Sequence, residues 1–532
     1  MTTAVPDLAA AASALDDAHA VIDAAVVVLA RDSIDVRQVL AYEVAHAAAA
    51  VATGRGLLDY GGKGPAEAAI TCAFVADAVG DLAGRTFGRE GEWGIDPGAL
   101  DATRGFLSAY RAPEFLATID DPGARHLDDD MELVADTFRR FAEKELAPIA
   151  EHIHRTNGDI PEEIIGGLAE LGAFGLSIPT DYGGFGEGGE GEYVAMVVAT
   201  EELSRGSLGA GGSLITRPEI LARALLAGGT EEQKQRWLPQ LASADVMNAV
   251  AVTEPDFGSD VAGVKVTATP TEGGWLINGV KTWCTFGARA DVLLLLARTD
   301  TDRSLGHRGL SLFIAPKPRG DGHGFELVQE AADGAPGGGK MEGRPIDTIG
   351  YRGMHSYEIA LDDWFVAAEN LIGMDGGEGR GFYYQMAGFE NGRIQTAARA
   401  IGVMQAAYEA AREYAVDRKV FGHPIGDYQL TQAKLGRMAV LIQASRQFAY
   451  VVAGLMAKGE GAMEASLIKA YVCKAAEWVT REAMQIHGGM GYAEEYDVSR
   501  YFVDARVLSI FEGADETLCL KVIARRLVAT AE

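Results

Sequence analysis

The periodicity of the chain changes within Val264–Lys281, which reads VKVTATPTEGGWLINGVK. Apolar and polar residues alternate over Val264–Ala268, a period of two that is typical of a half-buried strand. Gly273–Gly274 then gives a hairpin signal, and a second strand is expected over Trp275–Lys281. This stretch therefore predicts a β-hairpin.

Strand-like segments continue beyond the hairpin, at Val292–Ala297, Leu310–Ala315 and Tyr357–Leu361. The glycine- and proline-rich stretch Gly334–Gly343 interrupts them. Together these segments predict a β region from about residue 248 to about residue 370.

Helical periodicity lies on both sides of the β region. Apolar residues recur three and four positions apart in Met131–Phe141 and Ile164–Leu171. After the β region two apolar stripes predict long helices, the second ending at Gly488–Gly489. The stripes are Ile394, Ala397, Ala398, Ile401, Met404, Tyr408, Ala411 and Ala415, and Ile468, Val472, Ala475, Val479, Ala483 and Ile486. Helices, then strands, then helices predict an α+β protein and argue against a Rossmann fold.

The length of 532 residues favours about three or four domains. We expect a helical extension over 1–125, a helical domain over 126–247, a β domain over 248–370 and a helical bundle over 371–532. The turn-rich Asp120–Gly123 is the expected linker after the extension, in which no catalytic signature is found.

The charge of the chain excludes some partners. It holds 47 basic and 76 acidic residues, a net charge of −29, which repels nucleic acids and anionic membranes. No apolar run approaches the ~18–20 residues that span a bilayer, and the N-terminus lacks a basic signal-peptide region. The four cysteines lie far apart, without metal-ligand spacing, which indicates a reducing compartment. We therefore expect a cytoplasmic protein that binds neither nucleic acid nor membrane.

Three motifs resemble nucleotide-binding or metal-binding sites but are not expected to be such sites. Gly184–Gly189 matches GxGxxG, but the acidic residues in and after it would repel a pyrophosphate. Gly334-x4-Gly339-Lys340 resembles a P-loop, but Met341 has no hydroxyl for Mg²⁺, so a flexible surface loop is expected there. His152 and His154 form an HxH without an evident third ligand, so we expect an exposed helix and no metal site.

Five short segments resemble the acyl-CoA dehydrogenase family, in the family's order. They are Ala251–Asp260, Asn278–Gly287, Asp417–Ile425, Gln485–Gly491 and Ile510–Gly513. The resemblance runs from about His126 to the C-terminus. It implies a helical lobe, a central β-barrel or sheet domain and a C-terminal four-helix bundle, with the helical extension added, and an oxidoreductase with FAD as cofactor.

The resemblance also implies residues that bind FAD. Thr253 would reach the pyrimidine edge of the flavin and Ser259 its pyrophosphate, while Trp283 would pack beside the ring and Thr285 lie near N5. A strand with an ordinary core tryptophan is the plain alternative for this segment.

A second set would bind the FAD of a neighbouring subunit. It comprises Arg418, Phe421, Gln429, Gln485, Gly488 and Gly489. Glycines let backbone N–H groups approach phosphate closely, although a helix C-cap alone would also explain the two glycines. If each site needs two chains, the protein is a homodimer or tetramer.

Glu512 matches the catalytic base of the family, and Gly513 follows it in the substrate site. The resemblance implies that Glu512 removes the α-proton of an acyl-CoA while a hydride passes from Cβ to flavin N5. Between substrate and flavin the carboxylate is expected to lose hydration. An exposed glutamate before a helix is the plain alternative. Glu390 and Arg393 match a pair at the pantetheine, and a surface ion pair is a live alternative for them.

Three features resemble a subgroup that converts (2S)-methylsuccinyl-CoA to mesaconyl-CoA in the ethylmalonyl-CoA pathway. They are the N-terminal extension, Trp283-Cys-Thr-Phe286 and the run Gly350–Glu358. The free carboxylate of this substrate needs a polar or cationic partner, for which Arg352 is one choice. Butyryl-, isobutyryl- and glutaryl-CoA remain alternative substrates. Electron-transfer flavoprotein is the expected acceptor, with an acyl-CoA oxidase and a non-enzymatic flavoprotein as alternatives.

Overall fold

A computed structural model describes residues 4–320, 323–332 and 335–531 of the chain, apart from the side chain of Glu390. The chain forms two compact units, one of Met1–Asp136 with Thr396–Glu532 and the other of Thr137–Gln395. Helices α8 (Asp129–Phe141) and α14 (Gly381–Asp417) contribute residues to both units.

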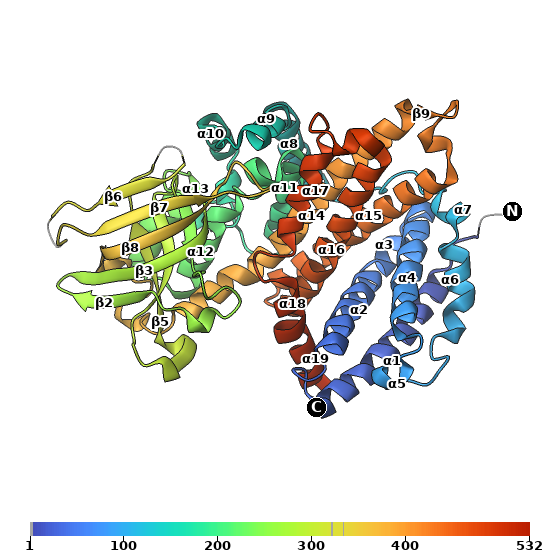
Figure 1. The fold of residues 1–532 in the computed structure, drawn as a ribbon, viewed down its shortest axis with the longest axis horizontal. Coiled ribbons are helices and arrows are strands. Elements are labelled where there is room, and N and C mark those ends of the chain that lie inside the picture. Colours follow the sequence, from blue (N-terminus) through green and yellow to red (C-terminus); the bar gives the residue numbers. More distant parts are fainter. Residues whose placement is uncertain (1–3, 321–322, 333–334, 532) are drawn as a thin grey trace. The chain divides into compact units, whose positions relative to one another are not determined.

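The first unit is helical. Its N-terminal part contains helices α1 to α7, which are Leu8–Asp32, Gln38–Gly56, Leu58–Gly61, Pro65–Thr86, Glu90–Trp93, Arg104–Tyr110 and Pro113–Leu116. Its C-terminal part contains α15 to α19, which are Gln429–Ala457, Ala462–His487, Val498–Leu508, Asp515–Thr517 and Ala524–Ala531. Helices α2 and α4 pack against α15 and α16 (Figure 1).

Both predicted apolar stripes lie on long helices. The stripe from Ile394 to Ala415 is buried along α14, and the second is buried along α16 except for the partly exposed Ile486. Helix α16 ends at His487, where Gly488 takes a φ of 60° that suits glycine. The sequence prediction of these helices is confirmed.

Helix α15 qualifies the expectation that no stretch could span a membrane. By its length and its mean hydropathy of 1.3 over an 18-residue window, this helix is long and apolar enough to cross a membrane. However, 78% of this window is buried within the protein, as in the core helix of a globular protein.

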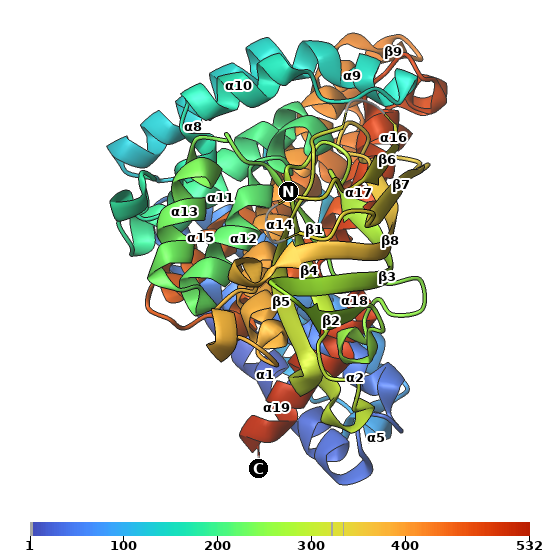
Figure 2. The same ribbon diagram turned by 90° about the vertical axis from the view of Figure 1, so that its left-hand side faces the viewer.

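The second unit combines helices with a mixed sheet. Helices α9 to α13 are Ala147–Thr156, Glu162–Glu170, Glu190–Gly206, Thr216–Gly228 and Glu231–Ala242. Strands β1 to β8 are Asn248–Ala251, Thr267–Thr271, Gly274–Thr285, Val292–Arg298, Leu310–Pro316, Phe325–Val328, Lys340–Ile346 and Ser356–Ala367. The strand order is β1-β4-β2-β3-β8-β7-β6, with β5 on β4 (Figure 2). This arrangement of helices and a mixed sheet confirms the predicted α+β class.

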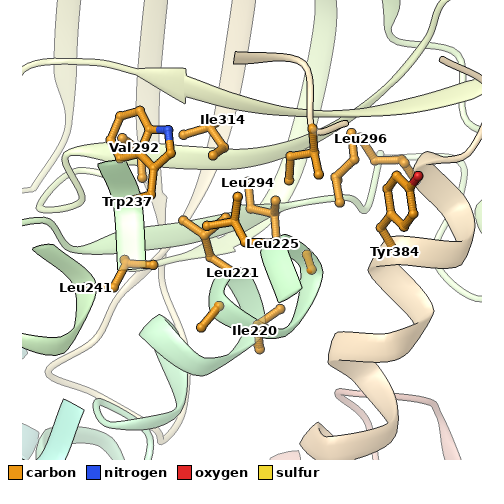
Figure 3. Close-up of a cluster of buried hydrophobic side chains, with 14 of the residues drawn as sticks. Ile220, Leu221, Leu225, Trp237, Leu241, Val292, Leu294, Leu296, Ile314 and Tyr384 are labelled. Carbon is orange, nitrogen blue, oxygen red and sulfur yellow. The ribbon is translucent and has the colours of Figure 1, made fainter. Parts of the chain in front are cut away.

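The hairpin predicted from Val264–Lys281 is formed by strands β2 and β3, although β2 begins at Thr267 and not at the expected Val264. They pair antiparallel, with Thr271 opposite Gly274, so the turn falls at the predicted glycines. Every residue of strand β4 is buried, which agrees with its apolar run over Val292–Ala297. Leu294 on β4 and Ile314 on β5 pack against Leu221 of α12 and Trp237 of α13 (Figure 3).

The expectation that Gly334–Gly343 interrupts the strands is wrong for its last four residues, of which Lys340 was also expected in a surface loop. Residues 333 and 334 lie outside the described part, but strand β7 begins at Lys340 and pairs with β8. Met341 is buried, and a Cβ at Gly343 would lie 2.1 Å from the Phe325 ring. Gly343 therefore makes room for an aromatic side chain within a sheet and does not mark a loop.

Candidate active site

Two predicted flavin residues, Thr253 and Trp283, are held together at the end of strand β3. The Thr282 N–H donates to the Thr253 carbonyl across 2.8 Å. The pairing of β3 with β8 is irregular between Lys281 and Cys284, and Trp283 has a φ of 57°. This irregularity turns the Trp283 ring outward, where its side chain is 54% exposed although both neighbours are buried. An exposed aromatic ring at this position can stack on a planar cofactor.

Thr285 and Ser259 lie on either side of this aromatic ring along the chain. The Thr285 and Ser356 hydroxyls are 3.0 Å apart, at the paired ends of β3 and β8. Ser259 is exposed on the segment that leaves Thr253. The structure thus presents two hydroxyls and an aromatic ring in one unit, a set that fits a flavin.

A buried ion pair fixes this part of the site. The Lys281 ammonium lies 2.9 Å from Glu254 and donates to the Val252 carbonyl, so it contacts both neighbours of Thr253. Glu254 also accepts from the N–H groups of Lys265 and Val266. Burial lowers the pKa of Lys281, because the charged form loses hydration. The sequence motif contains both Glu254 and Lys281, but their pairing was not predicted.

Glu512 lies in a tight turn before α18. It has a φ of 53° and Gly513 one of 104°, so two successive residues have left-handed backbone. The Glu512 side chain is only 8% exposed. The plain alternative of an exposed glutamate does not describe this residue.

The Glu512 carboxylate binds two side chains of α14. Arg399, whose side chain is fully buried, donates from Nη2 to Oε1 across 2.7 Å. Thr396 donates from Oγ1 to Oε2 across 2.9 Å and accepts from Arg399 across 3.0 Å. The carboxylate is therefore shielded from water and also lies beside a cation, and this cation was not predicted from the sequence. An arginine within the apolar stripe, one turn from a threonine, was the available signal.

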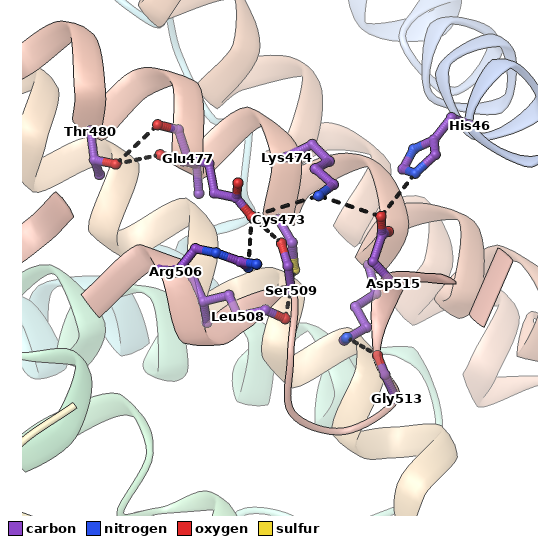
Figure 4. Close-up of polar contacts among 12 residues, drawn as sticks. His46, Cys473, Lys474, Glu477, Thr480, Arg506, Leu508, Ser509, Gly513 and Asp515 are labelled. Carbon is purple, nitrogen blue, oxygen red and sulfur yellow. Dashed lines mark hydrogen bonds and ion pairs between the residues drawn. The ribbon is translucent and has the colours of Figure 1, made fainter. Parts of the chain in front are cut away.

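The turn that carries Glu512 is tied to the helices around it (Figure 4). The Lys469 ammonium donates to the Gly513 carbonyl across 2.6 Å, and the Asp515 N–H donates to the Ser509 carbonyl across 3.0 Å. Asp515 itself is almost completely buried. The turn Ser509–Asp515 is thus closed by contacts on both its backbone and its side chains.

The residues predicted to reach a neighbouring cofactor lie on the first unit. Arg418 and Phe421 are exposed, and Phe421 exposes 93% of its surface. The Gln429 amide donates to Glu114 of the N-terminal extension across 3.0 Å. Exposed cationic and aromatic side chains of this kind suit contact with a second chain.

The end of α16 lies beside the end of α14. The Tyr414 ring stacks on His487 with centroids 4.3 Å apart, which places Gly488 beside the last turn of α14, directly before Arg418. Gln485 accepts the Gly488 N–H through its carbonyl, as at a helix C-cap. The structure therefore brings the predicted glycines and Arg418 to the same end of the bundle.

The structure describes fewer contacts for three residues that were predicted to bind the substrate. Arg393 is partly buried on α14, and the Glu390 side chain lies outside the described residues, so the pairing of these two residues stays a prediction. Arg352 donates to the carbonyls of Thr348 and His154. Through these bonds Arg352 connects two backbone segments of the second unit.

Among the described residues, two clusters have ligand atoms close enough for a metal ion. They are His46 with Asp515 and Cys519, and Asp159 with His323 and His355. Neither contains His152 or His154. Only His152 of that pair is exposed on α9, and the expectation of an exposed helix is wrong for His154, which packs into the interior.

Comparison with sequence families covers the chain after the extension. Residues 128–245, 249–364 and 379–528 match the N-terminal, middle and C-terminal domains of acyl-CoA dehydrogenase. (2S)-methylsuccinyl-CoA dehydrogenase of Cereibacter sphaeroides is 46% identical over 407 residues, which cover 76% of this chain and 71% of that protein.

Solved structures show the same similarity. Butyryl-CoA dehydrogenase of Megasphaera elsdenii aligns with a TM-score of 0.67 and 31% identity, covering 76% of this chain and 99% of its own. A glutaryl-CoA dehydrogenase solved with glutaryl-CoA aligns with a TM-score of 0.66 and 31% identity, covering 75% and 95%.

Proposed function

The chain belongs to the acyl-CoA dehydrogenase family of FAD-dependent oxidoreductases, and we propose that it oxidises (2S)-methylsuccinyl-CoA to mesaconyl-CoA. FAD is its cofactor and an acyl-CoA thioester its substrate class. The relative from C. sphaeroides supports this choice of acyl group. The structural observation that carries the proposal is the contact between Glu512 and the buried Arg399.

The second carboxylate of this substrate explains why a buried cation is useful beside the base. In (2S)-methylsuccinyl-CoA that carboxylate is attached to Cβ, so a base at the α-proton lies about 5 Å from it. Two negative charges at that separation repel by about 3 kcal/mol at an effective dielectric constant near 20. Arg399 stays charged at all working pH values and has several donors, so one guanidinium can serve both carboxylates. A butyryl chain has no charge to neutralise.

The proposed reaction assigns the proton to Glu512. Its carboxylate takes the α-proton while Cα and Cβ become doubly bonded. FAD, when bound, would supply the two-electron acceptor for the β-hydride. Thr396 and Arg399 hold both carboxylate oxygens before the transfer and so limit the orientations of the base. As the family resemblance implies, the Glu512 N–H is the proposed donor to the thioester oxygen.

The cofactor and substrate residues are proposed from the family resemblance of the motifs that contain them. We assign Thr253, Ser259, Trp283 and Thr285 to the flavin of one chain. Arg418, Phe421, Gln429, Gln485, Gly488 and Gly489 are assigned to the FAD of a neighbouring chain. Glu390, Arg393 and Gly513 are assigned to the acyl-CoA.

Because each FAD would then contact residues of two chains, we propose that the protein is a homodimer or tetramer. We further propose a cytoplasmic enzyme that passes electrons to electron-transfer flavoprotein. An acyl-CoA oxidase is the alternative, in which O₂ takes the electrons. Comparing turnover of the same substrate with O₂ and with an artificial acceptor distinguishes the two.

The test of the substrate is an anaerobic titration of the purified holoenzyme while flavin absorbance is followed. (2S)-methylsuccinyl-CoA is compared with 2-methylbutyryl-CoA, in which a methyl group replaces the carboxylate, and with butyryl-, isobutyryl- and glutaryl-CoA. We expect rapid bleaching by methylsuccinyl-CoA alone. Faster bleaching by 2-methylbutyryl- or butyryl-CoA would show that the carboxylate is not recognised.

The role of the base is tested separately with Glu512→Gln. This variant keeps the volume of the side chain but has no proton acceptor of comparable basicity. It should still bind methylsuccinyl-CoA and should reduce its flavin at least ~100-fold more slowly, the range expected for loss of a general base. A wild-type reduction rate would place the base elsewhere.

A further inference from the structure

The N-terminal extension contacts the turn that carries Glu512. We propose that Tyr42 and His46 on helix α2 are positioning residues, which hold Asp515 and thereby fix the Glu512 carboxylate for proton abstraction. This inference rests on the proposed role of Glu512 as the base. It gives a catalytic purpose to a segment in which the sequence shows no catalytic signature.

Asp515 is the point at which the two segments meet. The Tyr42 hydroxyl donates to its Oδ2 across 2.5 Å, and the His46 Nε2 lies 3.2 Å from the same oxygen. The Lys474 ammonium, on α16, lies 3.5 Å away, while the Asp515 side chain is 4% exposed (Figure 4). Two of these three partners of a buried carboxylate therefore come from the extension. The geometry suits an anion, and interactions with these three side chains lower the pKa of Asp515 to about 2 although burial opposes this.

The path from Asp515 to Glu512 is short and constrained. Only Gly513 and Ala514 separate the two residues, and the backbone of the turn is fixed at Ser509 and Gly513 by the hydrogen bonds described above. Glu512 and Gly513 both have left-handed backbone, which persists only when surrounding contacts hold it. A shift of Asp515 would therefore be transmitted to Glu512, and a misplacement of about 1 Å can slow catalysis by up to about 100-fold.

A metal ion explains the cluster less well. His46, Asp515 and Cys519 have ligand atoms close enough to share one. However, the Tyr42 hydroxyl and the Lys474 ammonium already contact the same carboxylate, and a nearby ammonium opposes a second cation. The hydrogen-bonded and ion-paired arrangement satisfies Asp515 without a metal.

The test measures anaerobic flavin reduction by methylsuccinyl-CoA in full-length holoenzyme variants. Tyr42→Phe removes only the hydroxyl, and His46→Ala removes the imidazole. We expect each to lower the limiting rate of reduction by about tenfold, with the substrate concentration at half-maximal rate nearly unchanged. His46→Gln, whose amide can donate to Asp515, should restore most of the rate.

Two matched controls separate positioning from general loss of stability. Asp35→Asn breaks an exposed ion pair with Lys521, between the extension and the C-terminal helices, without touching Asp515. Tyr110→Phe removes a hydroxyl that donates to the Val5 carbonyl within the extension. Both controls should keep the wild-type reduction rate, and all variants should retain their flavin.

The inference is overturned if Tyr42→Phe and His46→Ala reduce at the wild-type rate. It is also overturned if Asp35→Asn slows reduction as much as they do, since the role would then be structural. Failure of His46→Gln to recover activity while His46→Ala is slow would contradict a hydrogen bond to Asp515. A wild-type rate in Glu512→Gln would instead contradict the proposed base, so the two failures are distinguishable.

Discussion

The Arg399 guanidinium donates to the Glu512 carboxylate across 2.7 Å, from a side chain that solvent does not reach. A buried ion pair of this kind contributes little net stability, because removing two charges from water costs about as much as their attraction returns. Arg399 also packs over the Phe511 ring, 4.7 Å from its centroid. A buried arginine that contacts both Glu512, the proposed base, and Phe511 before it is better explained by chemistry than by folding.

Replacing Arg399 should alter substrate choice. Arg399→Met keeps much of the volume and removes the charge, so methylsuccinyl-CoA should lose about 100-fold in kcat/KM, corresponding to about 3 kcal/mol. The loss for 2-methylbutyryl-CoA should be at least tenfold smaller, because that substrate has no second carboxylate. Steady-state kinetics with both substrates check this ratio. Equal losses would mean that Arg399 acts on Glu512 alone and does not contact the second carboxylate of the substrate.

Thr396 should affect the rate of proton transfer more than substrate binding. Thr396→Val keeps the shape of the side chain but removes its donor to Glu512 and the acceptor for Arg399. Loss of a hydrogen bond to a charged group costs about 1.5 kcal/mol, which predicts roughly tenfold slower flavin reduction. Thr396→Ser retains the hydroxyl and should reduce at close to the wild-type rate in stopped-flow absorbance measurements. A slow Thr396→Ser enzyme would point to packing of the methyl group instead.

The secondary structure around the site could be predicted because local patterns determine it. The hairpin followed from alternation and paired glycines, and the long helices followed from their apolar stripes. The position of Gly343 within a strand was not predicted, because glycine in a strand and glycine in a loop look alike in sequence. Its role depends on the Phe325 ring, a neighbour in the fold.

The contacts of the site were largely hidden for the same reason. Glu512 was predicted from its motif, but its partner Arg399 lies more than a hundred residues earlier, and Tyr42, which contacts Asp515, lies earlier still. The pairing of these side chains is set by helix packing, which no local pattern encodes. An arginine in an apolar stripe signals only that some acidic partner exists.

The buried Lys281–Glu254 pair should be important for stability and for FAD retention. Lys281→Met leaves the Glu254 carboxylate buried without its cation, which costs about 3–5 kcal/mol. Because the pair holds the backbone beside Thr253, bound flavin should also fall. Thermal unfolding and the flavin-to-protein absorbance ratio measure the two effects. Lys265→Gln, which removes an exposed ion pair with Asp256, is the control and should change stability by less than about 0.5 kcal/mol.

Asp515 should make the fold sensitive to acid. Its pKa is about 2 in the folded protein, below the ordinary 3.8, so the fold favours the charged form. The difference contributes about 2 kcal/mol above pH 5, and this is lost as the pH falls through about 4 toward 2. In Asp515→Asn the contribution is absent at every pH. Urea unfolding from pH 6 to pH 3 should therefore show the advantage of the wild type shrinking by about 1 kcal/mol. A constant difference over this range would mean that Asp515 gains no net stability from Tyr42, His46 and Lys474 as an anion.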